Sequence, residues 1–364
     1  MESHMRVGYA NLRRTVKTHR KEISDAITEC LDNSYYIKGP KLAEFEEILS
    51  AYCRRSAVGV SNGTSALLLA YEQMGIGPGD KVIVPSFTFI STAEMLSKLG
   101  AVPVWVDVNM HDYTIDIEDL ERKMDTHGKD IKAIVGVDCY GHTCDWDKIK
   151  EIANIYFIPV IQDAAQSFGG EYKGQINGSY NLTCFSFYPS KNLFCLGDGG
   201  AVTGTKEECD KIRMRGDHGR TSKWEHEFCG WNERLDSMQA NILNRLIKYT
   251  NKFNKERIKI AKIYNDNLII NGTPQTADWC THVFNQYTIL VNNRDELFTK
   301  LADKGIGCGK AWPRGLHQQE CYADSDALCP NTEILAEEII SLPCYPGLTQ
   351  TEQAYVIEQV NALT

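Results

Sequence analysis

The chain has 364 residues, of which 43% are hydrophobic and 24% charged, a composition typical of a globular protein long enough for two domains. Lys and Arg number 39 against 48 Asp and Glu, so the formal net charge is −9, and no dense basic run is present that would bind nucleic acid. No stretch approaches the ~20 apolar residues of a membrane span, and the polar amino terminus does not resemble a signal peptide. We therefore expect a cytoplasmic protein that binds neither nucleic acid nor membrane.

The 13 cysteines are scattered through apparent strands and helices, without the spacing of a disulfide framework, so we expect free thiols. Cys139, His142 and Cys144 lie close together in the sequence. A second pair of ligands at a suitable spacing is missing, and no metal site is predicted.

From about residue 57 onward, short β-rich runs alternate with amphipathic helical stretches. This alternation is typical of an α/β protein, in which helices cover both faces of a mainly parallel sheet. The first strand leads through residues 61–65 into a predicted helix at 66–74. The predicted strands of the sheet cover residues 57–60, 81–85, 103–107, 133–137, 159–162, 184–187 and 201–203.

The stretch 235–268 is polar and contains neither Gly nor Pro, which predicts one long helix that connects a large domain to a smaller one. The smaller, α+β domain is predicted to contain a strand at 286–291 and helices at 295–304 and 349–362. The predicted boundaries are an N-terminal arm at 1–15, a large domain at 16–248 and a small C-terminal domain at 249–364.

Polar side chains follow two of the predicted strands. Asp163 comes directly after the strand that ends at Gln162, where a carboxylate faces the crevice in which α/β proteins bind ligands. Ser186 and Lys191 follow the next strand, and Pro189 forces a turn between them. Taken singly, the acid is more typical of a helix cap and the lysine of a solvated surface charge.

Residues nearby in the predicted fold supply further parts of a ligand site. Gly63 and Thr64 lie between a predicted strand and a predicted helix. Residues 197–200 read Gly-Asp-Gly-Gly, as a tightly turning backbone beside a ligand requires. With Lys191 as amine and Asp163 as acid, these features provide most of what an aldehyde cofactor with a phosphate tail needs, which also includes an aromatic ring to cover its face.

The motifs that contain these residues resemble, in order and spacing, those of the PLP-dependent sugar aminotransferases of the DegT/DnrJ/EryC1/StrS family, where PLP is pyridoxal 5′-phosphate. The resemblance covers nearly the whole chain, from about residue 8. It implies the aspartate aminotransferase-like fold (fold type I), with a mainly parallel mixed sheet in the large domain. The motifs are YIKGP at 36–40, SNGT at 61–64, PSFTF at 85–89, DAAQ at 163–166, SFYPSK at 186–191, GDGG at 197–200, HG at 218–219, NERLD at 232–236 and SLP at 341–343.

The resemblance implies a role for each of these residues. Lys191 would hold the cofactor as a Schiff base and later move protons between the substrate carbon and the cofactor. Asp163 would pair with the pyridine nitrogen, and Gln166 would lie near the 3′-oxygen of the ring. The cofactor phosphate would bind to Gly63, Thr64 and Ser186. The side chain of Phe89 would stack on the pyridine ring.

The resemblance also implies a homodimer with shared active sites, since Asn232 would reach the cofactor phosphate of the neighbouring subunit. Lysine at position 191 favours transamination, because a related branch of the superfamily has histidine there and performs dehydration. The implied partners are L-glutamate as amino donor, which leaves as 2-oxoglutarate, and a keto group on a nucleotide-linked sugar as acceptor.

The position of amination is predicted from two runs, 197–200 and 232–240, which are closer to the branch that acts on 3-keto sugars than to the C4 branch. We expect C3 amination of a dTDP-3-keto-6-deoxyhexose, or of UDP-linked 3-keto-GlcNAc or its uronic acid, for an amino sugar of a surface polysaccharide or glycoconjugate. The alternatives are a C4 aminotransferase of a nucleotide-4-keto-6-deoxy sugar and a PLP-binding regulatory protein of the same fold.

Two positions depart from the family pattern. Gln162 stands where Glu is common, and strand alternation turns it away from the crevice. Residues 309–317, GKAWPRGLH, stand where the family often has a His-Tyr pair before its proline, in a region that borders the sugar site. The candidate contacts to the sugar or its diphosphate are Lys223, His226, Lys310, Arg314 and His317.

Overall fold

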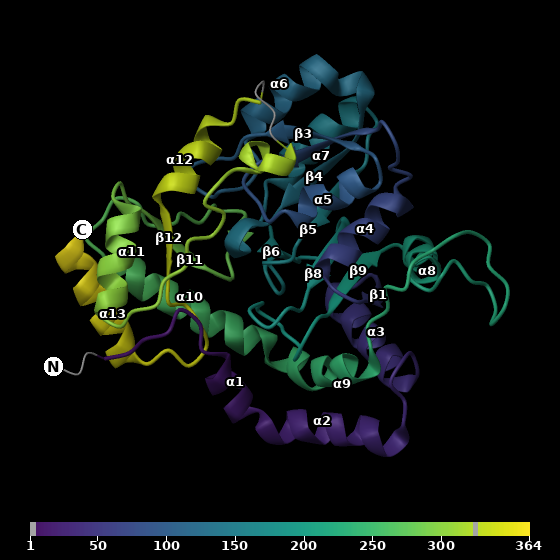
Figure 1. Ribbon diagram of the computed structural model, residues 1–364, viewed down its shortest axis with the longest axis horizontal. Helices are drawn as coiled ribbons and strands as arrows, with labels where there is room; N and C mark the ends of the chain where they lie inside the picture. The colour runs from purple at the N-terminus through teal and green to yellow at the C-terminus, as the bar shows by residue number, and fades with distance from the viewer. Residues whose placement is uncertain (1–4, 323–326) are drawn as a thin grey trace.

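A seven-stranded sheet forms the centre of the larger part of the molecule in the computed structural model, which describes residues 5–322 and 327–364 (Figure 1). Its strands are β1 (Ser56–Val60), β2 (Lys81–Pro85), β3 (Val102–Val106), β4 (Ile131–Val137), β5 (Val160–Asp163), β8 (Leu182–Ser186) and β9 (Gly200–Gly204). Across the sheet the order is β1-β9-β8-β5-β4-β2-β3. β9 is antiparallel to both neighbours, and all other neighbouring pairs are parallel. The expected α/β fold with a mixed, mainly parallel sheet is confirmed.

Each of these strands lies within two residues of a strand predicted from the sequence. Helices cover both faces of the sheet, so the strands are almost continuously apolar and easy to recognise. Alternate residues of one strand enter different cores: Val82 and Val84 pack on one face of the sheet and Ile83 on the other.

One face of the sheet is covered by α4 (Gly63–Gln73), α5 (Ser91–Lys98) and α8 (Lys206–Arg215). The other face is covered by α3 (Pro40–Cys53) and α9 (Ser237–Leu246) at one end and by α6 (Ile117–His127) and α7 (Trp146–Ile155) at the other. α4 begins three residues before the predicted helix, because the side chain of Asn62 accepts a hydrogen bond from the backbone of Ser65 and caps the helix there.

The C-terminal part has its own apolar core, beside the sheet in Figure 1. It contains α10 (Thr250–Asn267), α11 (Arg294–Asp303), α13 (Gln350–Leu363) and the antiparallel pair β11 (Tyr287–Leu290) and β12 (Ile339–Leu342). The sequence predicted β11 and these helices, but neither β12 nor α12 (Pro330–Glu338). The remaining short elements are β6 (Glu171–Tyr172), β7 (Gln175–Ile176), β10 (Cys280–Thr281), η1 (Gly128–Asp130), η2 (Cys139–Gly141), η4 (Leu316–Gln318) and η5 (Glu320–Tyr322).

The single helix predicted over 235–268 is wrong. α9 ends at Leu246, the 3₁₀ turn η3 (Ile247–Tyr249) follows, and α10 begins at Thr250. No glycine or proline causes this break. Ile247 is buried in the core of the large part, and the hydroxyl of Tyr249 donates to Glu22 at 2.6 Å, so tertiary contacts fix the turn.

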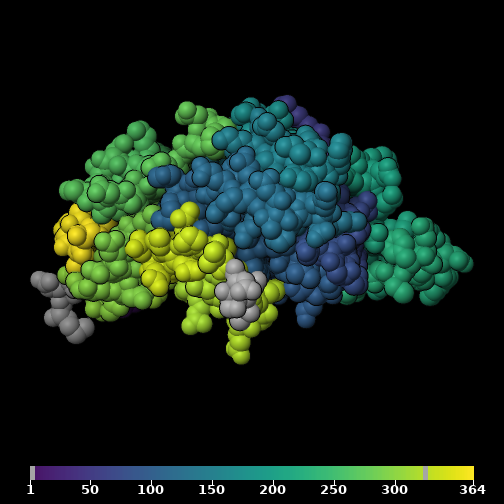
Figure 2. Space-filling view, turned by 90° about the horizontal axis from the view of Figure 1, so that it is seen from above, coloured from purple at the N-terminus to yellow at the C-terminus, as the bar shows by residue number. Residues whose placement is uncertain are grey.

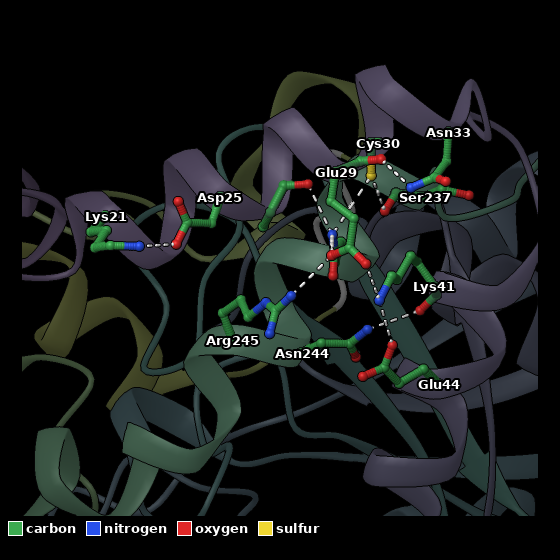
Figure 3. A network of polar contacts seen from close by, with 12 residues as sticks. Lys21, Asp25, Glu29, Cys30, Asn33, Lys41, Glu44, Ser237, Asn244 and Arg245 are labelled. Carbon is green, nitrogen blue, oxygen red and sulfur yellow. Dashed lines mark hydrogen bonds and ion pairs between the residues drawn. The ribbon is translucent and has the colours of Figure 1, made fainter.

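The three helices before the sheet were not predicted; they are α1 (Leu12–Thr18), α2 (Arg20–Asn33) and α3. α2 is attached to α3 and α9 by a polar network around Glu29 (Figure 3). The Glu29 carboxylate lies 2.8 Å from the amine of Lys41 and 2.9 Å from the guanidinium of Arg245, and it accepts a bond of 3.0 Å from Asn241. The hydrogen bond with Lys41 and the others hold the pKa of Glu29 down, to about 2.

Residues 1–4 of the predicted N-terminal arm lie outside the described residues. The following segment lies against the C-terminal part, where Val7 pairs with Ile306 and Arg14 binds Glu352 at 2.6 Å. At the opposite end, the loop after α8 projects from the rest of the molecule (Figures 1 and 2). The predicted division into an arm and two domains, with boundaries after residues 15 and 248, stays a prediction. In the described part of the chain, no helix is both long and apolar enough to cross a membrane.

Candidate active site

A cavity of about 840 Å³ opens at the carboxyl ends of β5 and β8. These parallel strands end at Asp163 and Ser186, so both side chains reach the same edge of the sheet, where α/β proteins bind ligands. The N-terminus of α4 and the loop that carries Lys191 complete the walls. The structure thus brings together residues that the sequence places more than 120 positions apart.

Asp163 is 5% exposed and lines the cavity. Its two carboxylate oxygens accept one hydrogen bond each, from the backbone N–H of Ala165 at 3.1 Å and from the hydroxyl of Thr92 at 3.0 Å. Burial raises the pKa of Asp163, against the lowering effect of these two donors and of Lys191. A buried carboxylate with only neutral hydrogen-bond donors is suited to receive a cation, such as a protonated ring nitrogen.

Lys191 lines the same cavity, and burial lowers the pKa of its amine to about 8, although Asp163 acts in the opposite direction. About a tenth of such an amine is neutral at pH 7, far more than for an ordinary lysine. The backbone around it is fixed by two buried amides: Asn192 donates to Asn254 at 2.7 Å, and Asn285 donates to the carbonyl of Ser190 at 3.2 Å. The backbone that carries Lys191 is therefore held in place, and a larger share of its amine is in the neutral, nucleophilic form.

The opposite end of the cavity is suited to an anion. Gly63 and Thr64 are the first residues of α4, and their N–H groups have no carbonyl partner within the helix. A Cβ at Gly63 would lie 2.8 Å from the Cβ of Ser186, so only glycine allows this close approach. Ser186 accepts a bond from the backbone of Tyr188 at 3.3 Å, which leaves its hydroxyl hydrogen to donate.

Gln166 and Phe89 also line the cavity. The amide oxygen of Gln166 accepts a bond of 2.6 Å from the backbone N–H of Tyr140, so its amide nitrogen is the group left to donate to a ligand. The ring of Phe89 is 57% exposed, which separates it from the apolar core in which a phenylalanine is ordinarily found.

Several cavity residues were not selected by sequence reasoning, among them Thr92, Trp312 and Glu233. Glu233 accepts a bond of 2.5 Å from the hydroxyl of Ser65 in the first turn of α4. Its position directly after Asn232 in the NERLD motif was the available signal. Thr92 gave none, because its contact with Asp163 joins residues 71 positions apart.

The other predicted site residues do not line this cavity. Asn232, Lys223 and His226 lie on or beside the projecting loop and are exposed. Lys310 is paired with Asp295 at 3.0 Å, and Arg314 is exposed.

His317 is buried instead, with its ring nitrogens 2.6 Å from the hydroxyl of Ser86 and 3.3 Å from the carboxylate of Glu333. Gln162 points away from the cavity, as strand alternation predicts. It donates to the buried carboxylate of Asp138 at 2.6 Å.

A cavity of this kind suits an aminotransferase that works with PLP, because the aldehyde, the ring nitrogen and the phosphate of that cofactor each find a matching group. The profile of the "DegT/DnrJ/EryC1/StrS aminotransferase family" matches residues 17–361. The chain belongs to this family, and the resemblance stated from its motifs is confirmed.

Curated relatives include sugar transaminases. The chain is 36% identical over 364 residues to the dTDP-3-amino-3,4,6-trideoxy-alpha-D-glucose transaminase of Streptomyces venezuelae, covering 98% of this chain and 95% of the relative. It is 37% identical over 334 residues to the UDP-2-acetamido-2-deoxy-3-oxo-D-glucuronate aminotransferase of Pseudomonas aeruginosa, covering 90% and 92%. Among solved structures, DesV of S. venezuelae in complex with a ketimine intermediate superposes with a TM-score of 0.95, at 36% identity over 98% of both chains.

Proposed function

We propose that the protein transfers the amino group of L-glutamate to the C3 keto group of a nucleotide-linked sugar, with PLP as cofactor. The observation that carries the proposal is that Lys191 and Asp163, an amine of lowered pKa and a buried acid, line one cavity. When bound, the cofactor supplies an electrophilic aldehyde and an electron-withdrawing ring.

The residues of the chain divide the remaining work. Lys191 would hold the aldehyde group of the cofactor, and its neutral amine would take a proton from the donor carbon and return one to the acceptor carbon. Asp163 keeps the ring nitrogen protonated, since its buried charge gains a cation by doing so. The amide nitrogen of Gln166 donates to the 3′-oxygen, and Phe89 covers one face of the ring.

The phosphate binds at the N-terminus of α4, with the N–H groups of Gly63 and Thr64 and the hydroxyl of Ser186 as donors. Glu233 lies at this end as well and accepts hydrogen bonds from Ser61 and Ser65. Since its charge is engaged by these hydroxyls, we assign it the role of orienting the first turn of α4 and not of binding the phosphate.

The active unit in this proposal is a homodimer. Asn232 does not line the cavity of its own chain, so a role at a phosphate requires the cavity of a second copy. Beside the NERLD segment lies an exposed apolar group, Tyr35, Tyr36 and Ile37, attached through the pairing of Ile37 with Asp236. Exposed apolar clusters of this kind mark protein interfaces, which supports contact with a second subunit there.

Amination at C3 is supported by the GDGG and NERLD runs and by the names of the relatives, which are a 3-amino sugar transaminase and a 3-oxo sugar aminotransferase. We place the reaction in the cytoplasm, in the synthesis of an amino sugar for a surface polysaccharide or glycoconjugate. All thirteen cysteines lie in the described part of the chain and are free thiols, which fits that compartment.

The test is product identification by NMR after incubation with glutamate and with matched 3-keto and 4-keto forms of dTDP and UDP sugars. We expect 2-oxoglutarate and a 3-amino sugar in equal amounts. A 4-amino product would move the reaction to the other carbon. A loaded protein that forms no 2-oxoglutarate with any of these sugars would contradict the proposed enzyme and favour a regulatory role.

A further inference from the structure

A second, smaller cavity adjoins Lys191. Its volume is about 270 Å³, against about 840 Å³ for the larger cavity, and both are lined by Tyr188, Ser190 and Lys191. Its remaining walls come from residues 10–12 of the N-terminal segment, from α10 and from the turn after β12. Lys191 therefore borders two compartments of different size.

Arg257 of α10 lines this second cavity and is 7% exposed. One nitrogen of its guanidinium, Nη1, donates to the carbonyl oxygens of Phe284 at 3.3 Å and Asn285 at 3.2 Å and also to that of Cys344. No carboxylate of the described chain lies within 4.0 Å of it, and Nε and Nη2 form no hydrogen bond there. Burial accordingly lowers the pKa of this guanidinium.

Arg294 provides a comparison within the same molecule. It is also 7% exposed and donates to two carbonyl oxygens, those of Ala336 at 3.1 Å and Ile339 at 3.3 Å. Unlike Arg257, it has an acid partner, Asp295, at 2.6 Å. A buried cation without an anion is costly, so the missing partner of Arg257 points to an anion that comes from outside the chain.

A neutral donor faces the same cavity. The hydroxyl of Tyr345, a residue that is 4% exposed, has no partner at ordinary hydrogen-bond geometry within the described chain, and the neighbouring side chain of Asn11 engages it only weakly. A guanidinium without an anion and a weakly engaged hydroxyl provide the two kinds of donor that bind a carboxylate. The cavity is too small for a nucleotide sugar, and it is large enough for a carboxylate with a short aliphatic chain.

We propose that this cavity binds a carboxylate of the amino-acid donor, through the guanidinium of Arg257 and the hydroxyl of Tyr345. This inference rests on the proposed function, in which the donor nitrogen must reach the cofactor beside Lys191. A dicarboxylic amino acid would then lie with its nitrogen at the junction of the two cavities and one carboxylate in the smaller one. The nucleotide sugar uses only the larger cavity, so the two substrates are recognised by different residues.

The first test is calorimetric binding of glutarate to the PLP-loaded protein, because glutarate has the carboxylates of the donor but no amine to transfer. We expect Tyr345→Phe to weaken binding about tenfold, or ~1.4 kcal/mol, and Arg257→Gln to weaken it further. The matched control is Thr250→Val, which removes another buried hydroxyl without a partner, on α10 but outside the cavity, and leaves binding unchanged.

The second test separates a binding role of Arg257 from a positioning role. Arg257 also contacts Asn285, which fixes the loop of Lys191, so damage to that loop would slow both halves of the reaction. We expect Tyr345→Phe to raise the half-saturating glutamate concentration about tenfold in the first half-reaction. The half-reaction of the amine form with keto sugar should keep its rate and half-saturation.

Unchanged glutarate and glutamate affinities in Tyr345→Phe, a variant that keeps the packing of the ring, would overturn the inference even if Arg257→Gln fails to fold. Equal loss in both half-reactions would overturn it as well. The proposed function fails separately: in that case the wild-type protein binds glutarate, with the same dependence on Tyr345, but transfers no amine from glutamate.

Discussion

At the residue scale, the state of the Lys191 amine decides how the cofactor is captured. The neutral amine is the nucleophile, and the pKa of Lys191 is lowered to about 8. The rate at which cofactor-free protein captures PLP should therefore increase about tenfold for each unit by which the pH rises, up to pH 8. Above that pH the rate should become constant. Stopped-flow absorbance measures the rate, and borohydride trapping with peptide mass analysis verifies the attachment point. A midpoint near the usual lysine value of about 10.4 would contradict the lowered pKa.

The buried charge of Asp163 has opposite effects on the two forms of the protein. Without a cofactor it lacks a cationic partner other than Lys191, so Asp163→Asn should stabilise the cofactor-free protein by about 1 kcal/mol. With the cofactor, the same change removes the partner of the ring nitrogen, and kcat should fall about 100-fold or more. Thermal unfolding of the cofactor-free and the PLP-loaded protein measures the effect on stability. Loading should increase the Tm of Asp163→Asn by less than it increases the Tm of the wild type.

A matched control for this substitution is Asp138→Asn. Asp138 is also buried, and burial raises its pKa to about 7, but its carboxylate accepts bonds from Gln162, Ser167 and Asn177 and does not line the cavity. Its loss should lower the stability of both forms alike. An equal increase of Tm on loading in wild type and Asp163→Asn would contradict the pairing of Asp163 with the cofactor.

At the scale of elements, Glu29 attaches α2 to α3 and α9 (Figure 3). We expect Glu29→Gln to lower the free energy of unfolding by about 1 kcal/mol at pH 7, because a charge shared by Lys41 and Arg245 is lost. The pKa of Glu29 is about 2 in the folded state, below the unfolded value of about 4.3, so its contribution is complete above pH 4.3. It disappears as the pH falls toward 2.

Denaturant unfolding at pH 7 and at low pH measures the difference between wild type and Glu29→Gln. The control is Asp25→Asn on the same helix, since Lys21 is the one ion-pair partner of Asp25 among the described residues, and both side chains are more than half exposed. Its effect should stay within about 0.5 kcal/mol at either pH. If the free energy of unfolding of wild type exceeded that of Glu29→Gln by the same amount at both pH values, the charge of Glu29 would not contribute to stability.

The sheet could be predicted from the sequence because strands that are buried on both faces are marked by apolar runs with turn residues between them. The helix break at 247–249 could not, since it depends on the burial of Ile247 and on a contact with Glu22 that only the folded chain brings near. The same distinction holds for the cavity. The motifs identified Lys191 and Asp163, whereas the Thr92 contact and the unpaired state of Arg257 are properties of the assembled fold.

The proposed sugar contacts show the limit of such reasoning. Lys223, His226, Lys310, Arg314 and His317 were selected by charge and by nearness to motifs, without geometry. In the fold four of them are exposed, and His317 is buried and hydrogen-bonded to Ser86. Their roles stay predictions, and any contact to a sugar from the projecting loop would have to reach a cavity other than that of its own chain.

At the scale of the whole molecule, the proposed dimer makes each active site depend on two subunits, Lys191 from one and Asn232 from the other. We expect Lys191→Ala and Asn232→Ala each to be nearly inactive. Random reassociation of the two variants should restore about a quarter of the wild-type activity, because half of the dimers are hybrids with one intact site of two. Steady-state release of 2-oxoglutarate after mild dissociation and remixing measures the recovery.

The control is the double variant, Lys191→Ala with Asn232→Ala in one chain, mixed with an equal amount of wild type. If the sites are shared, every hybrid has one lesion in each site, and only the wild-type dimers, about a quarter of the total, stay active. If each chain builds its own site, hybrids keep one intact site and the activity is about half, while the mixture of single variants recovers none. If the sites are shared, the two mixtures therefore have equal activities. If the sites are separate, one mixture keeps about half of the activity and the other has none. This difference decides whether Asn232 acts across the subunit interface.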